Sequence, residues 1–175
     1  MTKLDDHGTS VLLFIDMVNG SFSRFAKEFG NFLLTAVPQC IFGSTEFVYQ
    51  DYLHAYFSSA ASAMEGSNWN TMMEVTAGDG RSDIFTHDEE KGAILELKRY
   101  THKKKEGYHE KEKSLLSKGT KEALDQCDTR IYRAKMPKGV TTICEYGISF
   151  LGPYCGVAYA GKGRRKVGHT MRIFR

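Results

Sequence analysis

The stretch GDGRSDIFTHDEEKGAILELKRY, residues 78–100, contains two apolar segments separated by polar turn residues. Its second segment, GAILELK, is apolar on both sides of its alternation, which is typical of a central strand covered on both faces of a sheet. Side chains alternate along a strand, so Glu96 and Lys98 share one face with Ile94, while leucines fill the other. These charges need compensation, because an uncompensated buried charge costs several kcal/mol.

The preceding apolar segment, SDIF, supplies a carboxylate close to this pair. Asp83 lies in that segment, and a short polar turn joins it to GAILELK. Two carboxylates held together repel each other unless a proton or a cation lies between them, and oxygen ligands favour magnesium or manganese. The sequence therefore predicts a divalent-metal site at Asp83 and Glu96 with Lys98 beside it. The alternative is a water-facing Glu96–Lys98 ion pair on an edge strand.

The rest of the chain shows helical periodicity before this region and both kinds of periodicity after it. We expect helices at about 11–18, 21–37 and 45–64, strands at 70–77, 81–87 and 92–100, a helix at about 112–135, and strands at 140–151 and 153–160. Apolar spacings of three, four and seven residues predict the helices, and alternation between turn residues predicts the strands. This order predicts an α/β fold with a mixed central sheet flanked by helices.

Length and composition indicate one soluble domain. The chain has 175 residues, 41% of them apolar, and no apolar run long enough to span a membrane. We expect an N-terminal helical segment at about 1–40, a core at about 45–160 and a basic tail at 161–175. The four cysteines form no CxxC pair, which argues against a structural zinc site. The absence of a signal peptide pattern predicts an intracellular protein, cytoplasmic or nuclear, without a membrane partner.

Five motifs in order resemble those of the PD-(D/E)XK nuclease superfamily, in particular a nuclease-like family often found C-terminal to an AAA-ATPase-like domain. They are EFVYQ (46–50), GRSD (80–83), ELK (96–98), ALDQCDTRIY (123–132) and YGISF (146–150). The similarity extends over roughly three quarters of the chain. Ser82 stands where the superfamily name has proline, and Gln50 replaces the usual histidine of the first motif. The resemblance implies a restriction-endonuclease-like αβββαβ core, preceded here by N-terminal helices.

The resemblance also implies roles for individual residues. Asp83 and Glu96 would bind Mg²⁺ or Mn²⁺, and Glu46 would reach the same site from its helix. Lys98 would orient the attacking water or balance charge on the phosphate, and Gln126 would line the site. Residues expected to contact nucleic acid are Gln126, Tyr132, Arg81, Lys162, Arg164 and Arg165. The implied activity is metal-dependent hydrolysis of phosphodiester bonds, as in an endonuclease, with DNA favoured over RNA by analogy.

Other interpretations of the same residues stay open. Glu46 at a helix N-terminus is electrostatically favourable whatever its function, and Gln126 is equally suited to bonding a backbone group. The chain lacks the GxxxxGK[ST] motif of an ATPase. It is therefore either a metal-dependent nuclease or a catalytically silent nuclease-fold module that binds nucleic acid or protein. A homodimer and a separate ATPase partner are compatible with both.

Overall fold

The computed structural model describes residues 6–38, 40–41, 44–64, 66, 68–77, 80–101, 110–152 and 154–161. The helices are α1 (Asp6–Val18), α2 (Phe22–Thr35), α3 (Glu46–Ser62) and α4 (Glu110–Thr129), followed by the 3₁₀ helix η2 (Tyr132–Lys135). The strands are β1 (Asn70–Ala77), β2 (Gly80–His87), β3 (Lys91–Tyr100), β4 (Thr142–Leu151) and β5 (Tyr154–Gly161). No helix in the described part of the chain is both long and apolar enough to cross a membrane.

The five strands form one mixed sheet in the order β1-β2-β3-β4-β5. The first three strands are an antiparallel meander, β4 runs parallel to β3, and β5 returns antiparallel to β4. A parallel pair needs a long crossover connection, which α4 provides between β3 and β4. The predicted α/β class with a mixed central sheet flanked by helices is confirmed.

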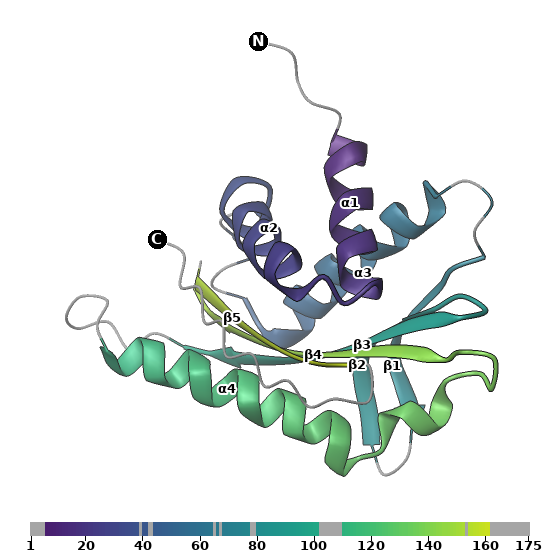
Figure 1. Cartoon of the computed structure of the whole chain (residues 1–175). Helices are drawn as coiled ribbons and strands as arrows, with labels where there is room; N and C mark the ends of the chain where they lie inside the picture. The colour runs from purple at the N-terminus through teal and green to yellow at the C-terminus, as the bar shows by residue number, and fades with distance from the viewer. Residues whose placement is uncertain are drawn as a thin grey trace.

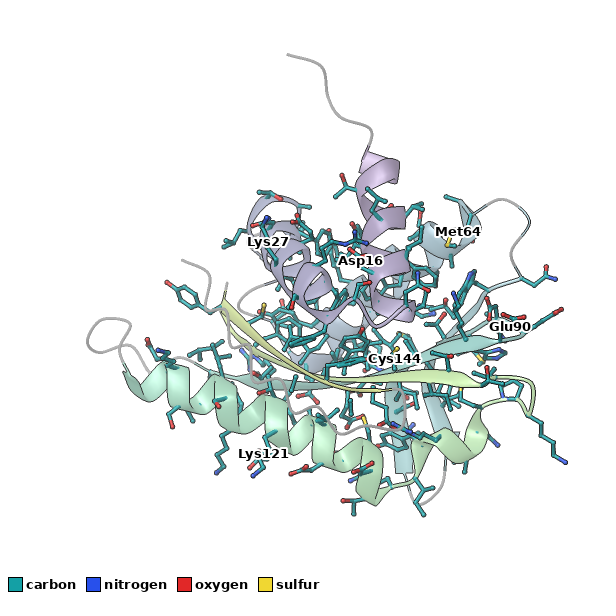
Figure 2. All side chains as sticks on the ribbon, viewed as in Figure 1. Asp16, Lys27, Met64, Glu90, Lys121 and Cys144 are labelled. Carbon is teal, nitrogen blue, oxygen red and sulfur yellow. The ribbon has the colours of Figure 1, made fainter. Side chains whose placement is uncertain are left out.

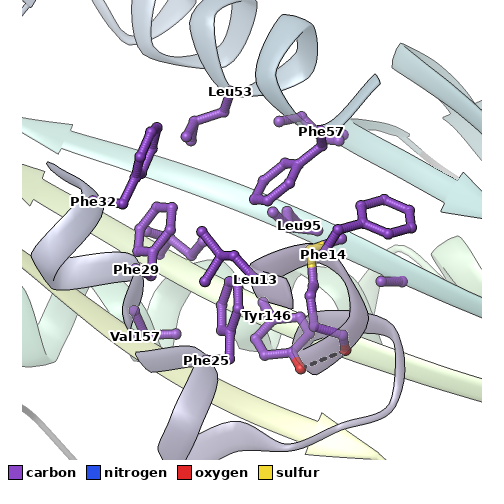
Figure 3. Close-up of a cluster of buried hydrophobic side chains, with 14 of the residues drawn as sticks. Leu13, Phe14, Phe25, Phe29, Phe32, Leu53, Phe57, Leu95, Tyr146 and Val157 are labelled. Atoms are coloured by element: carbon purple, nitrogen blue, oxygen red, sulfur yellow. Dashed lines mark hydrogen bonds between the residues drawn. The ribbon is translucent and has the colours of Figure 1, made fainter. Parts of the chain in front are cut away.

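Helices cover both faces of the sheet (Figure 1): α4 lies along one face, and α1, α2 and α3 lie on the other. The larger apolar cluster lies on the three-helix side, where Phe25, Leu95 and Tyr146 are among the buried side chains in Figure 3. The Tyr146 hydroxyl donates a hydrogen bond to the Met17 carbonyl oxygen at 2.7 Å, which ties β4 to α1. A smaller cluster, including Phe85, lies on the opposite face.

Strand β3 is the third of the five strands, and residues 92–97 are all buried. Leu95 and Leu97 belong to the cluster under α1, α2 and α3, whereas Ile94 belongs to the smaller cluster near η2. The prediction that GAILELK is a central strand covered on both faces is therefore confirmed. The edge-strand alternative for Glu96 is wrong, since that side chain is only 2% exposed.

Helix α4 packs very closely on β4, because glycine on the strand leaves room for helix backbone. A Cβ atom at Gly147 would lie 2.6 Å from the Leu124 nitrogen. The register of β3 and β4 places Gly147 beside Glu96. This close approach brings the next turn of α4, which carries Gln126, over the charged end of β3.

The predicted helix 112–135 is wrong at its C-terminal end. The α-helix ends at Thr129, and Ile131 adopts a left-handed conformation with φ 53° before η2 begins. The sequence pattern suggested that Ile131 continues the apolar stripe, yet this side chain is 58% exposed. The chain reverses here instead, which turns Tyr132 into the smaller core, where it is fully buried.

Candidate active site

The candidate site begins where the sheet is interrupted around Asp83. β2 pairs with β3 from His87 to Ile84, and among the described pairs Asp83 has no partner on β3 or on β1. On the β1 side the register skips Glu74, whose φ of 49° is rare for a residue with a side chain. Backbone in a sparsely populated conformation is often found at functional sites. The pairing of β2 with β3 therefore stops at the residue that the sequence singles out, whereas β1 and β2 skip one pair there and resume at Ser82.

Side chains and backbone from two other elements hold Asp83 in this gap. Its carbonyl oxygen accepts a hydrogen bond from Gln50 Nε2 of α3 at 2.9 Å, and its Oδ2 accepts one from the Leu97 N–H of β3 at 2.6 Å. Gln50 is only 3% exposed, so it supports the site from beneath. The residue that replaces the usual histidine of the first motif thus positions the backbone of Asp83.

Glu96 lies on β3 and is bound on one side only. Its Oε1 accepts hydrogen bonds from Gln126 Nε2 and, at 3.4 Å, from Lys98 Nζ. Its Oε2 is buried and has no hydrogen-bond partner among the described residues. A buried carboxylate oxygen without a partner is costly, so it needs either a proton or a cation.

Glu46 opens α3, and its Oε2 accepts a hydrogen bond from the Arg99 N–H at 2.9 Å. This contact joins the start of α3 to the end of β3. The N-terminal position also favours an anion through the helix dipole. Both effects hold Glu46 beside the gap.

One polar pocket of about 660 Å³ unites these side chains. Its lining residues are Glu46, Glu74, Thr76, Gly80, Arg81, Asp83, Glu96, Lys98, Gln126 and Arg130. Six of them, Glu46, Arg81, Asp83, Glu96, Lys98 and Gln126, were expected from the sequence. Gly80 belongs to the GRSD motif but was given no role, and Glu74, Thr76 and Arg130 were not expected. Alternation on β1 places Glu74 and Thr76 on one face, and the four-residue spacing from Gln126 indicates the position of Arg130.

Burial and the charges of neighbouring carboxylates raise the pKa values of Asp83 and Glu96. Burial is the main cause for Asp83, whose pKa is about 6; the Leu97 N–H opposes this, and the charge of Glu46 adds to it. Burial also raises the pKa of Glu96 to about 7, the charge of Asp83 adds to it, and Lys98 opposes it. Such perturbed carboxyl groups in a cleft indicate a functional site.

Tyr132 makes contacts within the protein that the sequence did not predict. Its hydroxyl donates a hydrogen bond to the Arg81 carbonyl oxygen at 2.6 Å and accepts one from Gln126 Nε2 at 3.1 Å. The side chain is fully buried, and it links Gln126 to the backbone of β2. Its expected contact with nucleic acid stays a prediction. The predicted contacts of Lys162, Arg164 and Arg165 lie outside the described residues.

A family model described as the PD-(D/E)XK nuclease superfamily matches residues 44–158. The chain belongs to this superfamily. The match begins just before α3 and ends within β5, so it includes every pocket residue described above. No curated protein and no solved structure matched the chain.

Nucleases of this superfamily typically use divalent metal ions, and the donor atoms of this site fit such an ion in part. The partnerless oxygen of Glu96 and the carboxylate of Asp83 are oxygen donors of the kind that Mg²⁺ prefers. Within the described residues, however, no three acidic, His or Cys side chains are grouped closely enough to form a metal centre. The expected three-carboxylate set with Glu46 is therefore not preformed. Two carboxylates are compatible with Mg²⁺, which usually keeps several waters.

Proposed function

We propose that this protein is a divalent-metal-dependent nuclease that hydrolyses phosphodiester bonds of nucleic acid, with DNA as the favoured substrate. The observation that carries the proposal is the buried Oε2 of Glu96, which none of the described residues hydrogen-bonds, in the same pocket as Asp83 and Lys98. A purely structural ion pair would not require a second buried carboxyl group beside it.

In this proposal Asp83 and Glu96 hold Mg²⁺ or Mn²⁺, and Glu46 adds negative charge from the start of α3. A bound ion of this kind lowers the pKa of water and balances the charge that develops on the phosphate. Asp83 is fixed by Gln50 and Leu97, and Glu96 by Gln126, so both carboxylates are oriented before substrate binds. Such preorganisation lowers the barrier because no reorganisation is needed during the reaction.

Lys98 is the candidate for contact with the reacting groups. Its Nζ lies 3.4 Å from Glu96 Oε1, and its side chain is 28% exposed within the pocket lining. From there it donates a hydrogen bond to the attacking water or to a phosphate oxygen. Hydrolysis forms a bond between the water oxygen and phosphorus and breaks the bond from phosphorus to the leaving oxygen. The water loses a proton to solvent, and the leaving oxygen gains one.

Cleavage assays test this proposal. Purified protein is incubated with plasmid, linear duplex DNA, single-stranded DNA and RNA, each with Mg²⁺, Mn²⁺ or a chelator. We expect cleavage of at least one substrate with metal and none with chelator. Asp83→Asn and Glu96→Gln should reduce cleavage to the level of the protein-free sample, and Lys98→Ala should reduce it severely while metal binding persists.

Lys121→Gln is the matched control, because Lys121 lies on the exposed side of α4 that faces away from the sheet (Figure 2). It should cleave like the wild type. If the wild-type protein binds nucleic acid but cleaves none of the substrates with either metal, the nuclease proposal fails. The silent nucleic-acid-binding module is then the better account.

We also propose that residues 1–175 form a single domain, because α1 and α2 contribute to the same apolar cluster as β3, β4 and β5. An intracellular location, a homodimer and a separate ATPase partner stay predictions from the sequence.

A further inference from the structure

Arg130 lines the pocket although none of the roles implied by the sequence motifs falls on it. It follows the last residue of α4, four positions after Gln126, and its backbone N–H donates to the Gln126 carbonyl oxygen at 3.0 Å. It therefore enters the pocket from the same helix end that holds Glu96 through Gln126. The side chain is half-buried.

Two contacts fix the guanidinium group of Arg130. Its Nη1 lies 3.5 Å from the Tyr132 hydroxyl, which is anchored to the backbone of β2 through the Arg81 carbonyl oxygen. The arginine side chain also lies against Gly80: a Cβ atom there would be 2.8 Å from Nη1 and closer still to Cδ. The glycine of the GRSD motif thus makes room for this arginine.

Of the three cations that line the pocket, Arg130 is the one for which the described residues provide no carboxylate within ion-pair distance, although its charge lowers the pKa of Glu96 from farther away. Arg81 pairs with Glu74 at 2.9 Å, and Lys98 lies 3.4 Å from Glu96. In the described part of the chain, Arg130 forms no ion pair within 4.0 Å. Most of its five N–H donors are therefore available to a ligand.

We propose that Arg130 forms a phosphate-binding subsite that holds a backbone phosphate of the nucleic acid beside the Asp83–Glu96 pair. This inference rests on the proposed function for the identity of the ligand. Four carboxyl groups line the pocket and repel a polyanion, so a fixed cation is needed to seat the backbone there. A guanidinium group binds phosphate oxygens with two parallel N–H bonds, which gives direction as well as charge.

Fluorescence anisotropy with labelled single-stranded and duplex DNA in the presence of chelator tests the subsite without cleavage. The affinity is measured over a range of salt concentrations for wild type, Arg130→Gln and Lys121→Gln. Loss of one phosphate contact should reduce the slope of log K against log salt by about 0.7 for single strands or about 0.9 for duplex. Lys121→Gln removes the same charge from the outer side of α4 and should leave the slope unchanged.

Gly80→Ala provides a second variant, because it keeps every charge but displaces the Arg130 side chain. It should weaken DNA binding and reduce the slope as Arg130→Gln does, and it carries the test if Arg130→Gln does not fold. Arg130→Lys should restore part of the slope. The inference is overturned if Arg130→Gln and Gly80→Ala both bind like the wild type, if Lys121→Gln weakens binding equally, or if the wild type binds no DNA.

The two proposals fail in different ways. If the wild type cleaves DNA with Mg²⁺ but Arg130→Gln has the same salt slope as the wild type, the phosphate-binding subsite is refuted and the nuclease proposal stands. If the wild type never cleaves but Arg130→Gln has a reduced salt slope, the nuclease proposal is refuted and the phosphate-binding role of Arg130 stands.

Discussion

Replacing Glu96 by glutamine removes a buried negative charge and keeps the shape of the side chain. The Oε1 atom of glutamine still accepts the hydrogen bonds that Gln126 and Lys98 donate to Glu96. Without metal, the ionised carboxylate opposes folding, because burial and the neighbouring Asp83 raise its pKa to about 7 from the ordinary 4.5. We therefore expect Glu96→Gln to stabilise the metal-free protein at alkaline pH.

The size of the effect follows from proton linkage. A carboxyl group whose pKa is higher in the folded than in the unfolded state favours folding only while it is protonated, so stability falls as pH rises from about 4.5 to about 7. At about 1.36 kcal/mol per pKa unit, the free energy of unfolding of Glu96→Gln should exceed that of the wild type by about 3 kcal/mol at pH 8. At pH 5 most of this stabilisation is absent, and less than about 1 kcal/mol of it remains.

Urea unfolding in the presence of chelator at pH 5, 6, 7 and 8 measures this difference. Glu145→Gln is the matched control, since Glu145 is also a buried strand residue but binds Arg133 through two hydrogen bonds of 2.6 and 2.5 Å. It should destabilise the protein by roughly 2 kcal/mol. Destabilisation by Glu96→Gln at pH 8, or a difference that does not change with pH, would show that the buried charge of Glu96 does not oppose folding.

Three further predictions concern the metal, the backbone and the support of Asp83. Mg²⁺ should raise the melting temperature more at pH 8 than at pH 5.5, because the carboxyl groups of Asp83 and Glu96, with pKa values of about 6 and 7, must lose their protons before they bind the ion. An equal rise at both pH values would count against the site. Ile131→Gly should be more stable than Ile131→Ala by about 1 kcal/mol in urea unfolding, because only glycine relieves the φ of 53°; equal stability would argue against strain there. Gln50→Met should lower the free energy of unfolding by about 1–3 kcal/mol, because it leaves the Asp83 carbonyl without its Gln50 donor, and an unchanged value would contradict that role.

The strands were predictable from the sequence because their signals are local. Alternation and turn residues placed β1 at 70–77, as observed, and β3 within one residue of its observed start. The central position of β3 followed from its continuous apolar character, and the side-chain period of two placed Glu96 and Lys98 on one face. The short turn between β2 and β3 predicted that Asp83 lies near Glu96, whereas the position of Gln126 came from the ordered motifs, because no local rule brings α4 over β3.

The missed features depend on contacts between distant segments. The end of α4 was misplaced because Ile131 fits the apolar helical spacing, whereas the burial of Tyr132 against β2 requires the chain to turn there. The gap around Asp83 involves the positive φ of Glu74, which has no sequence signature. Gln50 was noted in the first motif, but its hydrogen bond to the Asp83 carbonyl oxygen could not be read from the motif. Arg130 was overlooked because a basic residue at a helix end is usually solvated and favourable to the helix dipole.

If a divalent ion held by Asp83 and Glu96 makes this chain a nuclease, the initial rate of DNA cleavage must depend on the Mg²⁺ concentration. Wild type and Glu96→Gln are compared on one substrate at pH 8, where the Glu96 carboxyl group, with its pKa of about 7, is mostly ionised. We expect a cleavage rate that rises with Mg²⁺ and saturates for the wild type and that stays at background for Glu96→Gln. Equal saturation curves for the two proteins, or no dependence on Mg²⁺ in the wild type, would contradict this expectation.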